Sequence, residues 1–381
     1  SLNKGAKMFK KMSLTGTALI WMICLVLATF PAHARDSVKI TDSMNRELTI
    51  PHQIDRVICS NSGCLRLLTY LQAHDRIVAV DSIEVKGSPI DARPYAIANP
   101  QFKDYPIFGE FRGHDSPELI AGLDPQPQVM FKTYAARSGG VDTLQDKINI
   151  PVIGLGYGNL THGREELNQS LHLVGKALGV EDRAQEVISY FNDLQKDLEK
   201  RVADIPEDQR PSCYIGGLGQ RGPHGFQSTE PSYAPFEFLG AKNVAGVLST
   251  PEKRVSHANV AKEKILIWDP EIIFVDISTM RLDQAGNALD QLKNDPAYQS
   301  LGAVQSGKVY GVFPYNSYTQ NFESIFANSY FMGKILYPEQ FADIDPMQKA
   351  EEISTFLNGG PAFEELNNQL DGLGFSRISL D

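Results

Sequence analysis

The feature that most constrains the fold is a pair of amphipathic helices predicted back to back near the middle of the chain. Between Glu165 and Ala203 apolar residues recur mostly every three or four positions, with charged and amide side chains between them. This helical period is the strongest secondary-structure signal that a single sequence offers. Gly179 separates the two helices and Pro206 follows the second, as expected at helix ends. The apolar positions are Leu167, Leu171, Val174 and Leu178, and then Ala184, Val187, Ile188, Phe191, Leu194, Leu198 and Val202.

Short apolar runs alternate with helical patterns on both sides of these helices. The runs begin at Val57, Ile77, Val129 and Val152 before them, and at Ser212, Ile272 and Lys308 after them. Such alternation is typical of βαβ units with a mainly parallel sheet, and 381 residues are enough for two separate cores. We therefore predict an α/β fold of two Rossmann-like lobes with mainly parallel sheets, joined by one long α-helix. The lobes are placed at 35–161 and 210–381, with a helical linker at 162–209.

An internal repeat supports the equivalence of the two lobes. Glu118 stands six residues before Asp124-Pro125, and Glu263 stands six residues before Asp269-Pro270. An apolar run that reads as a buried strand follows each Asp-Pro pair. The repeated unit therefore predicts matching helix–strand elements in the two lobes.

The first 34 residues are typical of a secretory signal peptide. Lysines precede an apolar stretch over 18–30, and Pro31-Ala-His-Ala34 supplies the small residues of a cleavage site. We expect cleavage after Ala34 and a periplasmic location, with residues 1–7 as an N-terminal extension before Met8. An uncleaved membrane anchor is the alternative, although the apolar stretch is short for a membrane span.

Charge and cysteine content narrow the class of protein. Without the signal segment and its four lysines, 32 basic residues stand against 46 acidic ones, a net charge of −14. No basic cluster suggests nucleic acid as a partner. Cys59, Cys64 and Cys213 remain, an odd number that does not form a disulfide framework. Cys59 and Cys64 either pair across the turn between them or stay buried as thiols.

Tyrosines and arginines gather where the predicted strands end in both lobes. Because ligands of parallel sheets lie beyond the carboxyl ends of the strands, these side chains are the candidate ligand-binding residues. Aromatic walls with a few fixed charges suit a bulky ligand, and arginine suits carboxylate or other anionic oxygens. The candidates are Asn61, Ser62, Arg93, Tyr95, Arg112, Tyr134, Arg137 and Tyr157 from the first lobe, and Arg221, His224, Phe226, Tyr233, Tyr315 and Tyr318 from the second.

The sequence was also searched for three other kinds of site: a dinucleotide-binding site, a hydrolase active site and a bare metal site. Gly217 to Gly222 fits the dinucleotide fingerprint, but Pro223 and Gly225 break the helix that the fingerprint requires. No G-x-S-x-G motif occurs, although a hydrolase triad assembled only in space stays an alternative. His114 and His224 stay candidates for a bare metal site, which would need three or four converging ligands.

Several motifs along the predicted mature chain point to one family. They are the hairpin pattern from Ile40 to Pro51 with Arg56-Val57 after it, the two Glu…Asp-Pro units, the central helix, and Gly307-Lys-Val-Tyr-Gly-Val312. A chain with these motifs resembles the periplasmic solute-binding proteins that serve iron–siderophore, haem and cobalamin ABC importers. Arg93-Pro-Tyr, His224-Gly-Phe-Gln-Ser-Thr and Pro314-Tyr-Asn-Ser-Tyr resemble most the branch called iron ABC transporter substrate-binding proteins.

The resemblance implies a binding protein with no catalytic step and no intrinsic cofactor. It would act as a monomer that captures a metal chelate, most simply an iron(III)–siderophore complex, and delivers it to a permease and ATPase complex in the inner membrane. Glu118 and Glu263 match the positions that dock such proteins to the permease, although an acid in the first turn of a helix is also stabilised by the helix dipole. Cobalamin, haem, a nickel chelate or a bare metal ion are the alternative ligands, and a secreted hydrolase is the alternative of another class.

Overall fold

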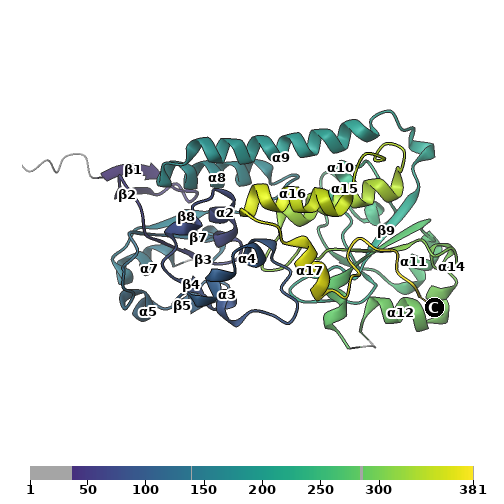
Figure 1. The fold of residues 1–381 in the computed structure, drawn as a ribbon, viewed down its shortest axis with the longest axis horizontal. Coiled ribbons are helices and arrows are strands. Elements are labelled where there is room, and N and C mark those ends of the chain that lie inside the picture. Colours follow the sequence, from purple (N-terminus) through teal and green to yellow (C-terminus); the bar gives the residue numbers. More distant parts are fainter. Residues whose placement is uncertain (1–36, 139, 284–285, 381) are drawn as a thin grey trace, which may run out of the picture.

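The computed structural model describes residues 37–138, 140–283 and 286–380 (Figure 1). The predicted signal segment lies outside the described residues. Among the helices that are described, none combines the length and the apolar character needed to cross a membrane.

The N-terminal lobe is built on the parallel sheet β3-β7-β8, which is buried throughout. Successive strand residues alternate between two faces. Cys59 and Phe131 pack toward the cluster that contains α2 and α8, whereas Ile58 and Met130 join Ile120 in the cluster beneath α5 and α7. The elements are β1 (Ser37–Thr41), β2 (Glu47–Pro51), β3 (Val57–Ser60), α2 (Cys64–Tyr70), β4 (Val80–Asp81), α3 (Ser82–Lys86), α4 (Pro94–Ala98), β5 (Ile107–Glu110), β6 (His114–Asp115), α5 (Pro117–Ala121), β7 (Val129–Thr133), α6 (Ala135–Ser138), α7 (Val141–Ile148) and β8 (Val152–Leu155).

The C-terminal lobe repeats this plan with the parallel sheet β11-β9-β13-β14. Its elements are β9 (Ser212–Gly216), β10 (Ser228–Thr229), α10 (Ala234–Phe238), β11 (Lys242–Asn243), β12 (Ala258–Asn259), α11 (Lys262–Trp268), β13 (Ile272–Asp276), α12 (Ala288–Asn294), α13 (Pro296–Gln299), α14 (Gly302–Gln305), β14 (Val309–Val312), α15 (Phe322–Leu336), α16 (Pro346–Asn358) and α17 (Phe363–Gln369). A single-turn helix over Ile277–Arg281 follows β13. The α/β fold with mainly parallel sheets is therefore confirmed.

The two central helices are α8 (Arg164–Leu178) and α9 (Glu181–Val202). All seven apolar positions predicted for the second helix are buried. At 1.5 Å per residue, the 22 residues of α9 span about 33 Å, and the helix runs along both lobes (Figure 1). In the middle of α9, Phe191 stacks on Phe326 of α15 with ring centroids 5.7 Å apart. The helix is thus anchored to the buried helix α15.

The C-terminal helices return to the N-terminal lobe. Helix α16 packs against α2 and α4, and the amide of Asn99 donates to the carbonyl of Asn358 at 3.1 Å. The side chain of Gln72 donates to the carbonyl of Leu357 at 3.1 Å. The lobes are therefore held together by these helices as well as by α9. The division of the chain at 161 and 209 stays a prediction.

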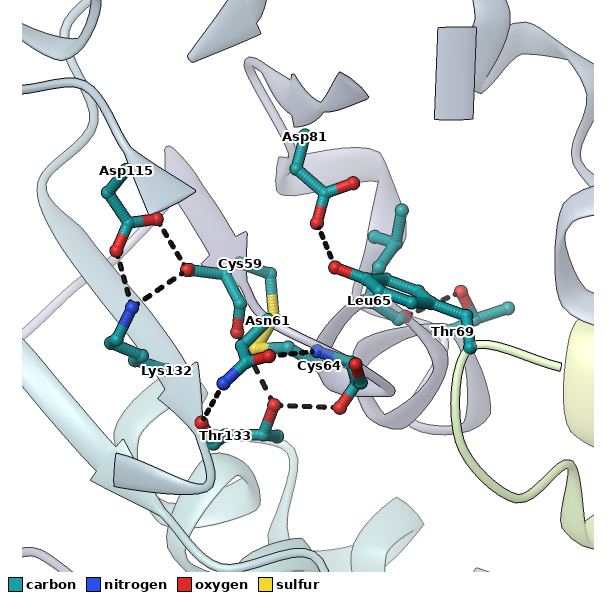
Figure 2. The surroundings of a disulfide bond; sticks show 12 residues. Cys59, Asn61, Cys64, Leu65, Thr69, Asp81, Asp115, Lys132 and Thr133 are labelled. Atoms are coloured by element: carbon teal, nitrogen blue, oxygen red, sulfur yellow. Dashed lines mark hydrogen bonds and ion pairs between the residues drawn. A yellow bond between two sulfur atoms is a disulfide. The ribbon is translucent and has the colours of Figure 1, made fainter. Parts of the chain in front are cut away.

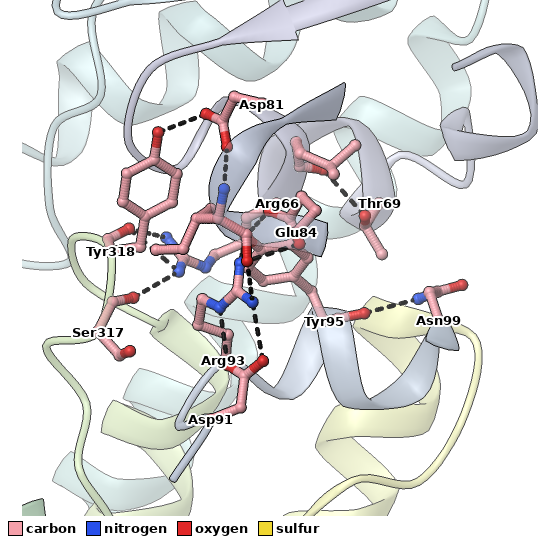
Figure 3. Close-up of polar contacts among 12 residues, drawn as sticks. Arg66, Thr69, Asp81, Glu84, Asp91, Arg93, Tyr95, Asn99, Ser317 and Tyr318 are labelled. Carbon is pink, nitrogen blue, oxygen red and sulfur yellow. Dashed lines mark hydrogen bonds and ion pairs between the residues drawn. The ribbon is translucent and has the colours of Figure 1, made fainter. Parts of the chain in front are cut away.

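A buried arginine joins the lobes at their centre (Figure 3). Arg66 of α2 is 0% exposed and donates to the carbonyl of Ser317 at 3.1 Å and to the side-chain oxygen of Asn321 at 3.1 Å. It also donates to the hydroxyl of Tyr157 at 2.6 Å. Burying a charge is unfavourable unless its donors are satisfied. The loop over residues 314–321 of the second lobe supplies most of those acceptors.

Replacing Arg66 with methionine should lower the free energy of unfolding by about 3 kcal/mol, because buried carbonyls lose a charged donor. Arg201→Met is the matched control. Arg201 pairs with the exposed Asp343 at 2.6 Å, and a surface pair of this kind contributes less than about 1 kcal/mol. Chemical denaturation of both variants measures the difference, and equal losses would contradict the central role given to Arg66.

Candidate ligand-binding cleft

A cleft of about 1070 Å³ lies between the two lobes. Its walls come from segments that follow the carboxyl ends of strands in both sheets, where ligands of parallel sheets bind. Residues 134–137 follow β7, residues 219–223 follow β9, and residues 314–320 follow β14. The carboxyl ends of β7, β9 and β14, where candidate ligand residues were predicted, therefore lead into this cleft.

Besides Arg93, which is paired with acids, four arginines line the cleft, and each lobe contributes two of them. Arg112 and Arg137 belong to the N-terminal lobe, and Arg221 and Arg281 to the C-terminal lobe. All four are exposed, and among the described residues none of them forms an ion pair. Arg281 was not predicted, although it follows the buried strand β13 by only five positions. The cleft is therefore positively charged in a chain whose net charge is −10.

The acids that line the cleft do not cancel this charge. Asp91 is paired with Arg93 at 2.7 Å. Glu230 is buried and accepts a hydrogen bond from the hydroxyl of Tyr315. Lys86, also on the cleft wall, is paired with Glu110 at 2.8 Å.

Aromatic rings stand beside two of the arginines. The guanidinium of Arg112 lies 5.2 Å from the ring centroid of Phe111, and that of Arg137 lies 5.8 Å from the ring of Tyr134. Cation–π contacts of this kind orient a guanidinium without using its donors. Within the described parts of the chain, neither guanidinium donates a hydrogen bond to another residue.

Backbone strain is concentrated at this cleft. Five lining residues other than glycine adopt left-handed φ angles: Arg112 (63°), Tyr134 (53°), Arg221 (57°), Tyr318 (51°) and Thr319 (66°). Such angles are unfavourable for residues with a Cβ atom, and strained residues cluster at functional sites. Two of the four cleft arginines are held in this conformation. This observation favours the cleft as the site of function.

The loop 314–321 forms one wall of the cleft and touches both lobes. The hydroxyl of Tyr318 donates to Asp81 at 2.5 Å and accepts from the backbone amide of Arg112 at 2.9 Å (Figure 3). Burial and the nearby Glu84 raise the pKa of Asp81 to about 7. In the other direction, the side chain of Asn316 donates to the carbonyl of Gly219 at 2.9 Å. The loop is thus fixed on both sides of the cleft.

A disulfide closes the turn that carries Ser62 to the cleft (Figure 2). It joins Cys59 at the end of β3 to Cys64 at the start of α2, which settles the alternative left open by the sequence. The same turn is held to β7 by the side chain of Asn61, which donates to the carbonyl of Thr133 at 3.1 Å. Cys213 is a buried thiol, and burial raises its pKa.

Most of the predicted ligand residues either line the cleft or lie in the core, and two belong to neither group. Those that line the cleft are Ser62, Arg93, Arg112, Tyr134, Arg137, Arg221, Tyr315 and Tyr318. Tyr95, Tyr157, Phe226 and Tyr233 are 0–1% exposed and lie in the hydrophobic clusters of the lobes. Asn61 stands next to Ser62, and the ring Nε2 of His224 donates to the carbonyl of Gln220 at 2.7 Å. These four core residues lie outside the lining of the cleft.

Arg93 differs from the other arginines of the cleft. It is only 2% exposed, because its guanidinium pairs with Glu84 at 2.9 Å and with Asp91 at 2.7 Å. Its donors are already used within the N-terminal lobe (Figure 3). We therefore treat Arg93 as a residue that shapes the cleft wall.

The two histidines considered for a metal lie in different lobes. His114 is exposed in β6, and the ring of His224 lies 5.7 Å from that of His257. Within the described ranges, no group of three or more histidine, cysteine, aspartate or glutamate residues is arranged to hold a metal ion. The donor set of the cleft suits an anion better than a bare cation.

The repeated glutamates occupy equivalent surface positions in the two lobes. Glu118 lies in the first turn of α5 and Glu263 in the first turn of α11, and both are exposed. Two residues after each glutamate, Ile120 and Ile265 are fully buried. The repeat thus turns an isoleucine inward and a glutamate outward in both lobes.

The strain at Arg221 can be tested by substitution with glycine, which adopts left-handed angles without a Cβ penalty. We expect Arg221→Gly to raise the free energy of unfolding by about 0.5 to 1 kcal/mol. Arg137→Gly, placed in helix α6, should instead lower it by about 0.5 to 1 kcal/mol. Thermal or urea unfolding of the two variants distinguishes them. A destabilised Arg221→Gly variant would show that this residue is not strained.

Comparison with known proteins places the chain among solute-binding proteins. Residues 57–314 match the family model described as periplasmic binding protein. The molybdate-binding protein MolA of Haemophilus influenzae is 25% identical over 345 residues, which cover 85% of this chain and 92% of that protein. The Fe(3+)-citrate-binding protein YfmC of Bacillus subtilis is 25% identical over 210 residues, or 54% of this chain and 59% of that protein.

Among solved structures, the fold is similar to that of a periplasmic solute-binding protein from Veillonella parvula. The TM-score is 0.66 at 17% sequence identity, and the alignment covers 88% of this chain and 96% of the other. At this level of identity the likeness shows the shared fold.

Proposed function

The chain belongs to the periplasmic binding protein family, and we propose that its ligand is an anionic metal chelate, most simply an iron(III) chelate. In this proposal the chelate is captured between the two lobes and delivered to the permease of an ABC importer. The observation that carries the proposal is the set of four exposed arginines, two from each lobe, that face one cleft without acidic partners among the described residues.

Arginine is well suited to the oxygens of such a ligand. Its planar guanidinium donates two parallel hydrogen bonds to a carboxylate and keeps its charge at any physiological pH. Contacts from Arg112 on one side and Arg221 on the other would hold an anion between the lobes. The rings of Phe111, Tyr134 and Tyr318 supply apolar surface for the organic part of a chelate.

The size of the cleft supports a chelate over a bare oxyanion. Pockets for drug-sized molecules have volumes of about 300 to 1000 Å³, and the cleft has about 1070 Å³. A tetrahedral oxyanion alone would leave most of that space to water. The similarity to a protein named for its binding of Fe(3+)-citrate is in keeping with an organic iron complex.

Molybdate is the second candidate, because the relative with 92% of its length aligned is a molybdate-binding protein. The same arginines suit a tetrahedral dianion. Calorimetric titration with iron(III) citrate and with sodium molybdate separates the two ligands. The proposal expects the iron chelate to bind more tightly.

Neutral substitution of the cleft arginines tests the role given to them. Arg112→Gln, Arg137→Gln, Arg221→Gln and Arg281→Gln should each weaken the binding of iron(III) citrate by about tenfold or more. A hydrogen bond to a charged group contributes about 1.5 to 3 kcal/mol, and about 1.4 kcal/mol is a factor of ten in affinity.

Arg201→Gln on α9 is the control, because this arginine lies far along the central helix in an ion pair with Asp343. The affinity of the Arg201→Gln variant for the chelate should equal that of the unmodified protein. Unchanged affinity in all four cleft variants would reject the anion-binding proposal.

Delivery can be separated from capture at the two repeated glutamates. We expect Glu118→Arg combined with Glu263→Arg to abolish uptake through the importer, since the change reverses the charge of both docking positions. The affinity for the ligand should not change, because both residues lie outside the cleft lining. Glu199→Arg, at an exposed position of α9, should leave uptake intact. Loss of ligand binding in the double variant would count against a docking role.

A further inference from the structure

We propose that Glu230 is a protonated hydrogen-bond donor to the captured anion, so that capture of the ligand is linked to a proton at this carboxyl group. This inference rests on the proposed function in one respect, since it takes the ligand to be an anion.

Glu230 lies at the junction of the cleft with a second cavity. It follows β10 and is 7% exposed. It lines both the cleft and a smaller cavity of about 200 Å³ behind it. Ser256, Tyr315 and Gln320 also line both spaces, so the two spaces adjoin at these side chains. A ligand that fills the cleft toward this side meets the Glu230 carboxyl.

The hydrogen bonds of Glu230 leave one oxygen available. The hydroxyl of Tyr315 donates to Oε2, and among the described residues Oε1 has no hydrogen-bond partner. A protonated carboxyl can therefore accept from Tyr315 with one oxygen and donate from the other. An anionic ligand offers the acceptor that this donor needs.

The charge of an ionised Glu230 would oppose the ligand. Asp91, the other acid on the cleft wall, is neutralised by its ion pair with Arg93. Among the described residues Glu230 forms no ion pair, and the arginine of the second cavity, Arg254, is paired with Glu237. A negative charge on this buried side chain would repel an anion, because charges at buried positions are weakly screened.

The surroundings of the carboxyl favour its neutral form. Burial, aided by the charge of Glu237, raises the pKa of Glu230 to about 8, while the bond from Tyr315 and the charge of Arg254 act in the opposite direction. The other titratable side chains on the second cavity are Tyr233 and His162. The carboxyl of Asp276 lies near Tyr315. Burial raises the pKa of Asp276 to about 6, so Asp276 titrates below Glu230.

The direction of the pH dependence follows from this arrangement. The anion binds better to the protonated form, so binding raises the pKa of Glu230 still further. Affinity is then full at pH values below about 8 and falls as the pH rises through that value. Above it, the loss of one proton lowers the affinity by up to about tenfold for each pH unit.

The test measures the affinity for iron(III) citrate and for molybdate between about pH 7 and pH 9.5, in the unmodified protein and in Glu230→Gln. Glutamine keeps an acceptor for Tyr315 and a donor for the ligand at every pH. At pH 7 the two proteins should bind alike. At pH 9.5 the variant should bind at least about tenfold more tightly than the unmodified protein. The ratio of the two affinities at each pH cancels any effect of pH on the ligand itself, because both proteins bind the same ligand.

A control variant and an independent calorimetric measurement complete the test. Asp81→Asn controls for another carboxyl that titrates near neutrality, the hydrogen-bond partner of Tyr318 on the cleft wall, with a pKa of about 7. This variant should keep the fall in affinity above pH 8. Calorimetry of the unmodified protein in two buffers of different ionisation enthalpy should show proton uptake on binding at about pH 8.5. This second measurement holds even if the Glu230→Gln variant does not fold.

Three outcomes would overturn the inference. The first is an affinity ratio that stays constant over the whole pH range. The second is a folded Glu230→Gln variant that loses binding at pH 7, which would make Glu230 an ionised acceptor. The third is the absence of proton uptake by the unmodified protein. If the unmodified protein binds neither probe at any pH, the anion-binding function itself fails, and the inference fails with it.

Discussion

The arrangement of the two lobes depends on the buried guanidinium of Arg66. A full positive charge in the interior is tolerated only when its donors are satisfied, and the acceptors come from both lobes. Tyr157 belongs to the first lobe, while Ser317 and Asn321 belong to the loop of the second. Separating the lobes at this point would remove the acceptors that Ser317 and Asn321 supply and leave a buried charge only partly satisfied. The loop 314–321 is therefore held in place before any ligand arrives, and a preorganised wall reduces the entropy lost on binding.

The arginines of this protein are of two kinds, which differ in their hydrogen-bond and ion-pair partners. Arg66 and Arg93 are buried and use their donors within the protein. Arg112 and Arg221 are exposed in the cleft, without acidic partners among the described residues, and have strained backbones. Strain of this kind persists only where the surrounding structure enforces it. The buried arginines thus fix the protein's own structure, and in the proposed function the exposed arginines bind the ligand.

Local patterns in the sequence were sufficient for the scaffold. The apolar positions of α9 from Ala184 to Val202 are the buried ones, because the period of a helix decides which side chains share a face. The strand ends also form the cleft, because parallel strands place their carboxyl ends at one edge. The contacts of single side chains were beyond this reasoning. Arg93 and Arg112 look alike as residues at strand ends, and only the fold brings Glu84 within 2.9 Å of the first.

Arg66 and Glu230 were missed for related reasons. Arg66 lies among the leucines of α2, where a charged residue on an apolar face signals a buried role. Its acceptors in the loop 314–321 are about 250 positions away in the chain. Glu230 carries no local pattern, and its importance comes from the tertiary position between two cavities.

The most direct test of the central claim is native mass spectrometry of the protein isolated from its own source, compared with its mass after denaturation. An added mass with the isotope pattern of a metal bound to an anionic organic chelator is predicted, and a bound species that is uncharged or positively charged would contradict the account.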